Sequence, residues 1–103
     1  MKKLKITLAC AGGMSSSMLC KTIIATAEKK GYLGTECNAY AVTALQSVAP
    51  GSDVILLGPQ IRYQLEDVIK KYPDIPVEVM NMKDYGMMNG EKIFNDMAER
   101  FGW

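Results

Sequence analysis

The segment LKITLACAGGMSSS, residues 4–17, decides the fold class of this chain. Residues 4–9 alternate and then become apolar, which predicts a first β-strand. Cys10 and the glycine pair after it predict a turn. Beyond Ser15, apolar residues recur at helical spacing up to a glycine stop at Gly31, which predicts a helix. The segment therefore indicates a strand, a loop and a helix in direct succession.

The rest of the chain alternates between strand and helix patterns in the same way. Further strands are predicted at residues 36–42, 53–58 and 76–80, and further helices at 43–49, 61–72 and 89–101. Strands that alternate with helices require crossover connections, so we expect an α/β doubly wound fold with a four-stranded parallel sheet covered on both faces. Such sheets bind ligands beyond the carboxyl ends of their strands, which is where Cys10 would lie.

Length and charge narrow the possible functions. The 103 residues suit one compact domain over residues 1–103. The net charge is +1, and basic residues are interleaved with acidic ones, so we expect no nucleic-acid partner. The apolar run at residues 6–10 is shorter than the roughly 7–15 residues that a secretory signal needs, and this predicts a cytoplasmic protein.

The residue types available for chemistry are unusually few. The chain contains no histidine, which removes the commonest general base, metal ligand and phosphoryl acceptor. Its cysteines, Cys10, Cys20 and Cys37, form no C-x-x-C pair. We therefore expect reduced thiols, no metal site and no cofactor.

The loop after the first strand could hold an anion. Two glycines allow successive backbone N–H groups to point toward one site, and the serines would begin a helix whose first N–H groups lack intrahelical partners. Such a cradle would bind a phosphate-sized dianion next to Cys10 and would also stabilise its thiolate as a nucleophile. The alternative is an ordinary strand-to-helix turn with a serine N-cap and a buried Cys10. The position at the end of the first strand favours the functional interpretation.

Two further cysteines and two methionines are interpreted mainly as packing or surface residues. Cys20 falls on the apolar face of the first helix and Cys37 lies in a strand, so both are expected to be packing residues. Met14 and Met18 leave two possibilities open: an exposed docking surface beside the loop, or, for Met18 at helical spacing, a place in the core.

Taken together, these motifs resemble the lactose/cellobiose family of phosphotransferase system (PTS) IIB proteins. The resemblance extends over essentially the whole chain. It rests on Cys10 with Gly13, Met14, Ser15 and Ser17, on the block LLGPQ at residues 56–60, and on the strand PVEV at residues 76–79 followed by Tyr85 and Gly86. It implies a flavodoxin-like fold similar to that of low-molecular-weight tyrosine phosphatase. One departure is Gly12, where relatives often have alanine or another small residue.

The resemblance also implies a function. Cys10 would accept a phosphoryl group from a phosphohistidine on a IIA protein and donate it to a sugar held by the membrane-embedded IIC component, with which the protein would associate peripherally. The phosphoryl oxygens would be bound mainly by backbone N–H groups of the loop, while Gln60 and Tyr85 would be its neighbours. The loop residues are Ala11, Gly12, Gly13, Met14, Ser15, Ser16 and Ser17.

Two other functions compete with this one. A low-molecular-weight phosphatase or arsenate reductase would read C-x-x-x-x-x-R-[ST], but Ser16 stands at the arginine position and Asp84 is the only candidate general acid near Tyr85. A non-catalytic interaction module with an inert Cys10 is the third hypothesis. The sequence names neither the sugar nor the particular IIA and IIC partners, nor the oligomeric state.

Overall fold

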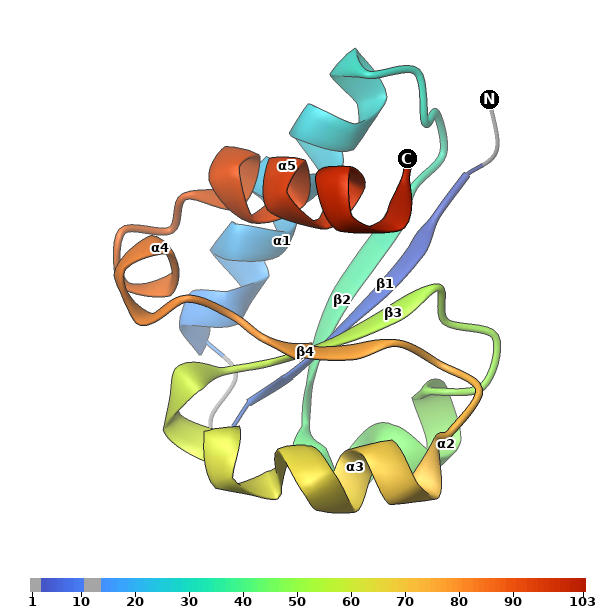
Figure 1. Ribbon diagram of the computed structural model, residues 1–103. Helices are drawn as coiled ribbons and strands as arrows, with labels where there is room; N and C mark the ends of the chain where they lie inside the picture. The colour runs from blue at the N-terminus through green and yellow to red at the C-terminus, as the bar shows by residue number, and fades with distance from the viewer. Residues whose placement is uncertain (1–2, 11–13) are drawn as a thin grey trace.

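The computed structural model describes residues 3–10 and 14–103, and it contains a four-stranded sheet between two layers of helices (Figure 1). The strands are β1 (Lys5–Cys10), β2 (Glu36–Ala41), β3 (Val54–Leu57) and β4 (Val77–Val79). The helical elements are α1 (Met14–Lys29), η1 (Val42–Ala44), α2 (Leu45–Val48), η2 (Pro59–Gln64), α3 (Leu65–Lys71), α4 (Met82–Gly86) and α5 (Gly90–Phe101), of which η1 and η2 are 3₁₀-helices.

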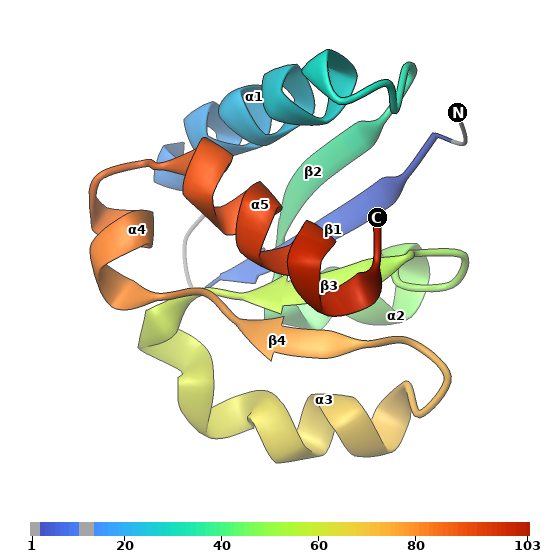
Figure 2. The same ribbon diagram turned by 45° about the horizontal axis from the view of Figure 1, so that its top comes forward.

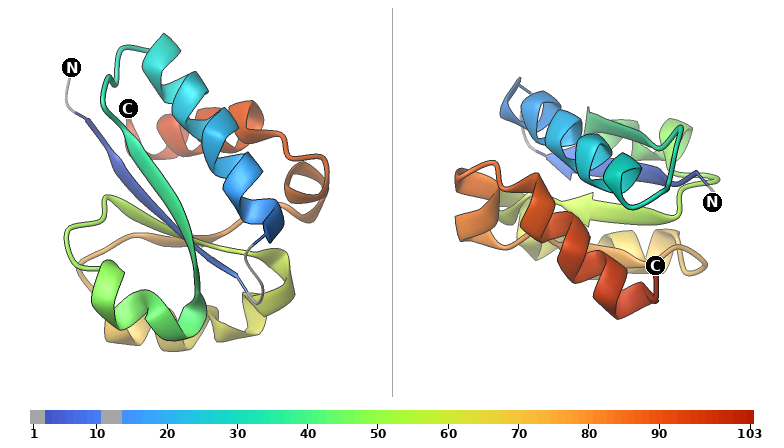
Figure 3. Two further views of the ribbon diagram at one scale, coloured as in Figure 1. Left: turned by 180° about the vertical axis from the view of Figure 1, so that it is seen from behind. Right: turned by 90° about the horizontal axis from the view of Figure 1, so that it is seen from above.

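The sheet has the predicted parallel, doubly wound topology. Its strand order is β2-β1-β3-β4, and every neighbouring pair is parallel. The order reverses at β1, from which the chain first moves outward to β2 and then crosses to β3. Helices α1 and α5 cover one face, and α2 and α3 cover the other (Figures 2 and 3). The carboxyl end of β1 therefore lies at the switch point, where open α/β sheets bind ligands.

Alternation along the central strands produces two separate hydrophobic cores. Ile6 and Leu8 point toward α1 and α5, whereas Ala9 points toward α2 and α3. Thr7 shares this second face and forms a buried 2.6 Å hydrogen bond with the hydroxyl of Ser52. Because β3 is buried on both faces, it reads in the sequence as a continuous hydrophobic run.

The C-terminal helix α5 shows how local signals set an element's bounds. Its N-cap residue, Asn89, accepts a hydrogen bond from the backbone N–H of Lys92, and its C-cap, Gly102, has the left-handed φ of 72° that suits glycine. Its apolar stripe is buried against α1 and the sheet through Ile93, Phe94, Met97 and Ala98. The prediction of this helix is confirmed to within one residue.

Some sequence-based expectations were wrong. Helix α4 was not predicted, because a five-residue helix is too short to show periodicity; its only signal is Asn81, whose side chain accepts hydrogen bonds from the backbone N–H groups of Lys83 and Asp84. In the helix predicted at residues 61–72, helical spacing places Ile69 on the apolar face, but this residue is 44% exposed. Met18 is 61% exposed, which decides between its two interpretations in favour of the surface.

None of the helices in the described ranges, 3–10 and 14–103, has the length and apolarity needed to cross a membrane.

Candidate functional site

Cys10 is the last residue of β1 and lies at the carboxyl end of the sheet. Its side chain is buried, and its thiol donates a hydrogen bond to the carbonyl oxygen of Tyr40 in the neighbouring strand, with a sulfur–oxygen distance of 3.8 Å. In the parallel register Cys10 lies opposite Ala41, the last residue of β2. The pattern of alternation that directs Ile6 and Leu8 toward α1 directs Cys10 to that face as well.

The proposed cradle lies only partly within the described residues. Ala11, Gly12 and Gly13 fall outside them, as do the side chains of Met14, Ser15, Ser16 and Ser17. The backbone of residues 14–17 forms the first turn of α1, one residue earlier than the sequence predicted. Since only residues 11–13 separate Cys10 from Met14, the thiol lies one short connection away from the positive end of the α1 dipole and from the first N–H groups of the helix, which have no intrahelical partners.

Gly58 forms the wall of the site on the β3 side. Its backbone N–H donates a 2.8 Å hydrogen bond to the carbonyl oxygen of Ala9, so the end of β3 is fixed beside the end of β1. A Cβ atom on Gly58 would lie 3.4 Å from the Cβ of Cys10 and 2.8 Å from Oε1 of Gln60. The side chain of Gln60 therefore folds back over Gly58 on the side of Cys10.

Tyr85 belongs to α4, which follows β4 at the same end of the sheet (Figures 1 and 2). Its side chain is half-buried and packs against the core formed by α1 and α5. Tyr85 thus lies on an element at the carboxyl end of the sheet, and its role beside the loop stays a prediction.

Exposed apolar side chains gather on the elements at this end. Met18 lies near the start of α1, Tyr63 in η2, and Met82 and Met87 at the two ends of α4; these four residues, here called the apolar rim, are between 61% and 76% exposed. Their elements occupy the carboxyl end of the sheet in both views of Figures 1 and 2. Sequence reasoning found only Met18, because Met82 and Met87 flank a helix that it missed.

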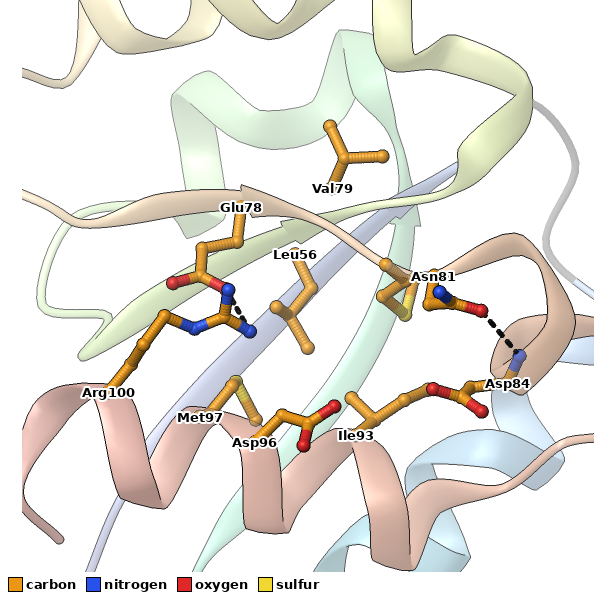
Figure 4. Close-up of a pocket in the computed structure, with 10 residues that line it drawn as sticks. Leu56, Glu78, Val79, Asn81, Asp84, Ile93, Asp96, Met97 and Arg100 are labelled. Atoms are coloured by element: carbon orange, nitrogen blue, oxygen red, sulfur yellow. Dashed lines mark hydrogen bonds and ion pairs between the residues drawn. The ribbon is translucent and has the colours of Figure 1, made fainter.

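A hollow lies between the end of β4 and α5, and charged side chains along it form ion pairs (Figure 4). Its volume is about 290 Å³, and Arg100 forms a 3.0 Å ion pair with Glu78 along one side. At the other side Asp84, which is 5% exposed, forms a 3.3 Å ion pair with Lys92. These ion pairs attach α5 to β4 and α4.

Cys20 and Cys37 are buried, as predicted for packing residues. The interaction between their thiols lowers the pKa of Cys20 and, together with burial, raises the pKa of Cys37. Neither belongs to the Cys10 site. Among the described residues there is no group of three or more histidine, cysteine, aspartate or glutamate side chains that could hold a metal ion.

Comparison with known proteins identifies the family. Residues 5–96 match the family described as "PTS system, Lactose/Cellobiose specific IIB subunit". The galactose-specific PTS EIIB component of Lactococcus lactis subsp. cremoris is 37% identical over 95 residues, which cover 85% of this chain and 87% of that protein. The chain belongs to the lactose/cellobiose-specific IIB family.

Solved structures agree with this assignment. The solution structure of the cellobiose-specific phosphotransferase IIB component from Borrelia burgdorferi is 39% identical, with a TM-score of 0.70, over 90% of this chain and 86% of that one. The lactose-specific IIB domain from Streptococcus pneumoniae, at 22% identity, shares the fold with a TM-score of 0.81 over 95% and 97% of the two chains. As a IIB protein, this chain is a component of a sugar phosphotransferase system, and the flavodoxin-like fold predicted from its sequence is confirmed.

Proposed function

We propose that this IIB protein carries a phosphoryl group on Cys10, between a phosphohistidine of a IIA protein and a sugar bound by the membrane component IIC. The observation that carries the proposal is the position of Cys10: the final residue of β1, at the switch point of the sheet, one short loop before the N-terminus of α1. A dianion bound there would lie near the helix N–H groups that lack intrahelical partners. The chain has no histidine that could accept the group instead.

The transfer consists of two displacements at phosphorus. In the first, the Cys10 thiolate attacks the phosphorus atom, the S–P bond forms and the P–N bond breaks, leaving the electron pair on the imidazole nitrogen. In the second, a sugar hydroxyl oxygen attacks and loses its proton to a base on the acceptor side, and the S–P bond breaks to restore the thiolate. Both steps develop charge on the phosphoryl oxygens, which the backbone N–H groups of residues 11–17 would stabilise.

Partner docking is the proposed role of the apolar rim, Met18, Tyr63, Met82 and Met87. A carrier must dock two different proteins on one site, and methionine side chains suit this because they are flexible and polarizable. Arg62 and Lys83 are exposed on the same elements and add positive charge that would attract a phosphorylated partner. We place the protein in the cytoplasm, bound to the membrane only through IIC.

Hydrolysis of a phosphocysteine is disfavoured by the burial and ion pairing of Asp84. A phosphatase needs a general acid that reaches the leaving group, yet this carboxylate is buried and ion-paired with Lys92 of α5. The arginine that would clamp the phosphoryl oxygens in a phosphatase is replaced by Ser16. A site without these groups suits the preservation of a phosphocysteine until an acceptor arrives.

Sugar specificity is assigned to the membrane component. The relatives compared above are named for galactose, cellobiose and lactose, although they share one fold with this chain. A chain that uses its switch point for the phosphoryl group would leave sugar selection to IIC.

The test is mass spectrometry of the protein after incubation with phosphorylated IIA. We expect a stable gain of one phosphoryl group in the wild-type protein and none in Cys10→Ser. Cys20→Ser and Cys37→Ser are matched controls that should still accept the group. Release of free phosphate would indicate a phosphatase, and an unchanged mass with a competent donor would indicate an interaction module.

A further inference from the structure

Cys20 and Cys37 come together from different layers of the fold. Cys20 lies in α1 and Cys37 in β2, and both side chains belong to the core between this helix and the sheet. They are 5% and 4% exposed, and their thiols are close enough to shift each other's pKa. Two neighbouring thiols at a helix–strand contact are the starting point for an internal disulfide.

The pair is not sealed inside the core. Cys20 and Cys37 both line one surface hollow of about 270 Å³, together with Lys21, Ile24, Asn38 and Ala39. The hollow lies over β2, an edge strand of the sheet. The hollow has room for a small neutral oxidant of the size of hydrogen peroxide beside the two residues.

The interaction between the two thiols makes them chemically unequal. It lowers the pKa of Cys20 and raises that of Cys37, so the Cys20 sulfur carries the negative charge more readily. Thiolate character determines which cysteine reacts first with an oxidant. Cys20 is therefore the attacking residue and Cys37 the resolving one.

We propose that Cys20 and Cys37 form a redox pair, which a hydroperoxide entering the hollow converts to an intramolecular disulfide between α1 and β2. This inference stands apart from the phosphoryl carrier function, since neither cysteine belongs to the Cys10 site.

The reaction balances with one peroxide. The Cys20 thiolate attacks one oxygen of hydrogen peroxide, the O–O bond breaks, and the products are a sulfenic acid on Cys20 and hydroxide, which takes up a proton to become water. The Cys37 thiol then loses its proton and attacks the Cys20 sulfur, the S–O bond breaks, and a second water leaves. The two thiols lose two electrons and two protons in total, and the peroxide gains them.

The disulfide would tie together two elements of the phosphoryl site. Helix α1 begins at the loop next to Cys10, and β2 provides the carbonyl of Tyr40 that accepts the Cys10 hydrogen bond. A covalent link between α1 and β2 removes conformational freedom from the unfolded chain, so the oxidised protein should melt about 5 °C or more above the reduced protein.

The experiment uses Cys10→Ser, which retains only the two cysteines of the pair. The folded variant is treated with hydrogen peroxide, free thiols are alkylated under denaturing conditions, and the product is weighed. We expect a monomer that is lighter by two hydrogen atoms, takes up no alkylating reagent, contains one peptide pair joined through Cys20 and Cys37, and is restored by dithiothreitol. Cys10→Ser/Cys37→Ala and Cys10→Ser/Cys20→Ala are the controls, neither of which can form this species.

Several results would overturn the proposal. The first is that both thiols are still alkylated, although Cys10 in a parallel wild-type sample is completely oxidised. The second is that disulfide-linked dimers are the main product. The third is that sulfinic acid forms without the internal disulfide. A second measurement needs no oxidant and no alanine variant: phenylarsine oxide, which bridges adjacent thiols, should bind the folded Cys10→Ser protein at one per chain and block alkylation of both cysteines. Failure of this bridging in the folded protein, with bridging only after unfolding, would equally refute the pair.

Discussion

A Cβ atom on Gly58 would lie 3.4 Å from the Cβ atom of Cys10, on the same face of the sheet. The φ and ψ of Gly58, −63° and 148°, are ordinary for any residue, so space rather than backbone conformation favours glycine here. The nearest obstacle is Oε1 of Gln60, at 2.8 Å, which lies at the end of a flexible side chain. A methyl group at this position would therefore move Gln60 before it disturbs Cys10.

This geometry predicts that Gly58→Ala and Gln60→Ala behave alike. Both should fold with a change in stability of no more than about 1 kcal/mol, because the displaced amide lies at the surface. Both should slow phosphoryl acceptance roughly tenfold if the amide bonds the phosphoryl oxygens, since a hydrogen bond to a charged group contributes about 1.5–3 kcal/mol. The measurement is the rate of phosphoprotein formation from phosphorylated IIA. If phosphoprotein formation is slow in Gly58→Ala but normal in Gln60→Ala, the cause is crowding of Cys10 by the added methyl group.

A cradle made of backbone N–H groups predicts an order of effects within the loop. Gly13→Val should impair phosphoryl acceptance more than Ser16→Ala, because a β-branched residue is poorly tolerated where the chain curls around an anion, whereas loss of one hydroxyl leaves the backbone donors in place. Acceptance rates and circular dichroism spectra of the two variants provide the comparison. The opposite order would indicate that side-chain hydroxyls hold the phosphoryl group.

The apolar rim predicts where IIA binds. Met87 and Leu33 are equally exposed, at 67%, but Met87 follows α4 at the Cys10 end, while Leu33 lies in the turn between α1 and β2 at the other end of the sheet. Met87→Gln should weaken the affinity for phosphorylated IIA about tenfold, the equivalent of roughly 1.4 kcal/mol of lost apolar burial. Leu33→Gln should leave it unchanged. Calorimetric titration of both variants makes the test, and equal effects would show that the rim is not the interface.

Lys92 predicts a dependence of stability on pH. Hydrogen bonds to Asp96 and Asp84 raise its pKa above the ordinary value, so its contribution to stability is complete below the pKa of an unfolded lysine, about 10.4. It is lost as the pH rises through the higher pKa of the folded state. The difference in unfolding free energy between wild type and Lys92→Met should therefore be constant near neutral pH and shrink in strong alkali. Urea unfolding across this range measures it; a difference that grows with pH would contradict the assignment.

How much the sequence could predict follows from the kind of signal that each part carries. The long elements were predictable because burial imposes a pattern: β3 is buried on both faces and reads as a continuous apolar run, and α5 shows helical spacing between caps. Helix α4 was not, since five residues contain little more than one turn. Its N-cap, Asn81, was a usable signal that went unnoticed.

The site was predictable to a similar extent. Cys10 and the glycines after it indicate the end of a strand, and Gln60 follows the end of β3. Cys10 and Gln60 could therefore both be placed at the carboxyl edge of the sheet. The contact between Cys20 and Cys37 could not be foreseen, because it depends on how α1 lies across β2. The same limit applies to Asp84, whose partner Lys92 is set by the angle between α4 and α5.

The close approach of α5 to α1 predicts that a side chain at Gly90 destabilises the protein. Gly90, the first residue of α5, is buried against α1, and a Cβ atom there would meet the hydroxyl of Thr22 and lie 2.8 Å from the backbone nitrogen of Ile23. The hydroxyl oxygen of Thr22 is itself held by a 2.8 Å hydrogen bond to the carbonyl oxygen of Leu19. Because one of the obstacles is backbone, the two helices must separate to admit a methyl group. Gly90→Ala should therefore lower the free energy of unfolding by about 1–3 kcal/mol, as overpacking does, although alanine is the better helix former by about 1 kcal/mol. Gly86→Ala is the matched control, because a Cβ atom on Gly86, in α4, meets nothing within 4 Å. It should be neutral or slightly stabilising. Urea unfolding of both variants decides the matter, and a Gly90→Ala protein as stable as Gly86→Ala would show that α1 and α5 are not in the close contact described here.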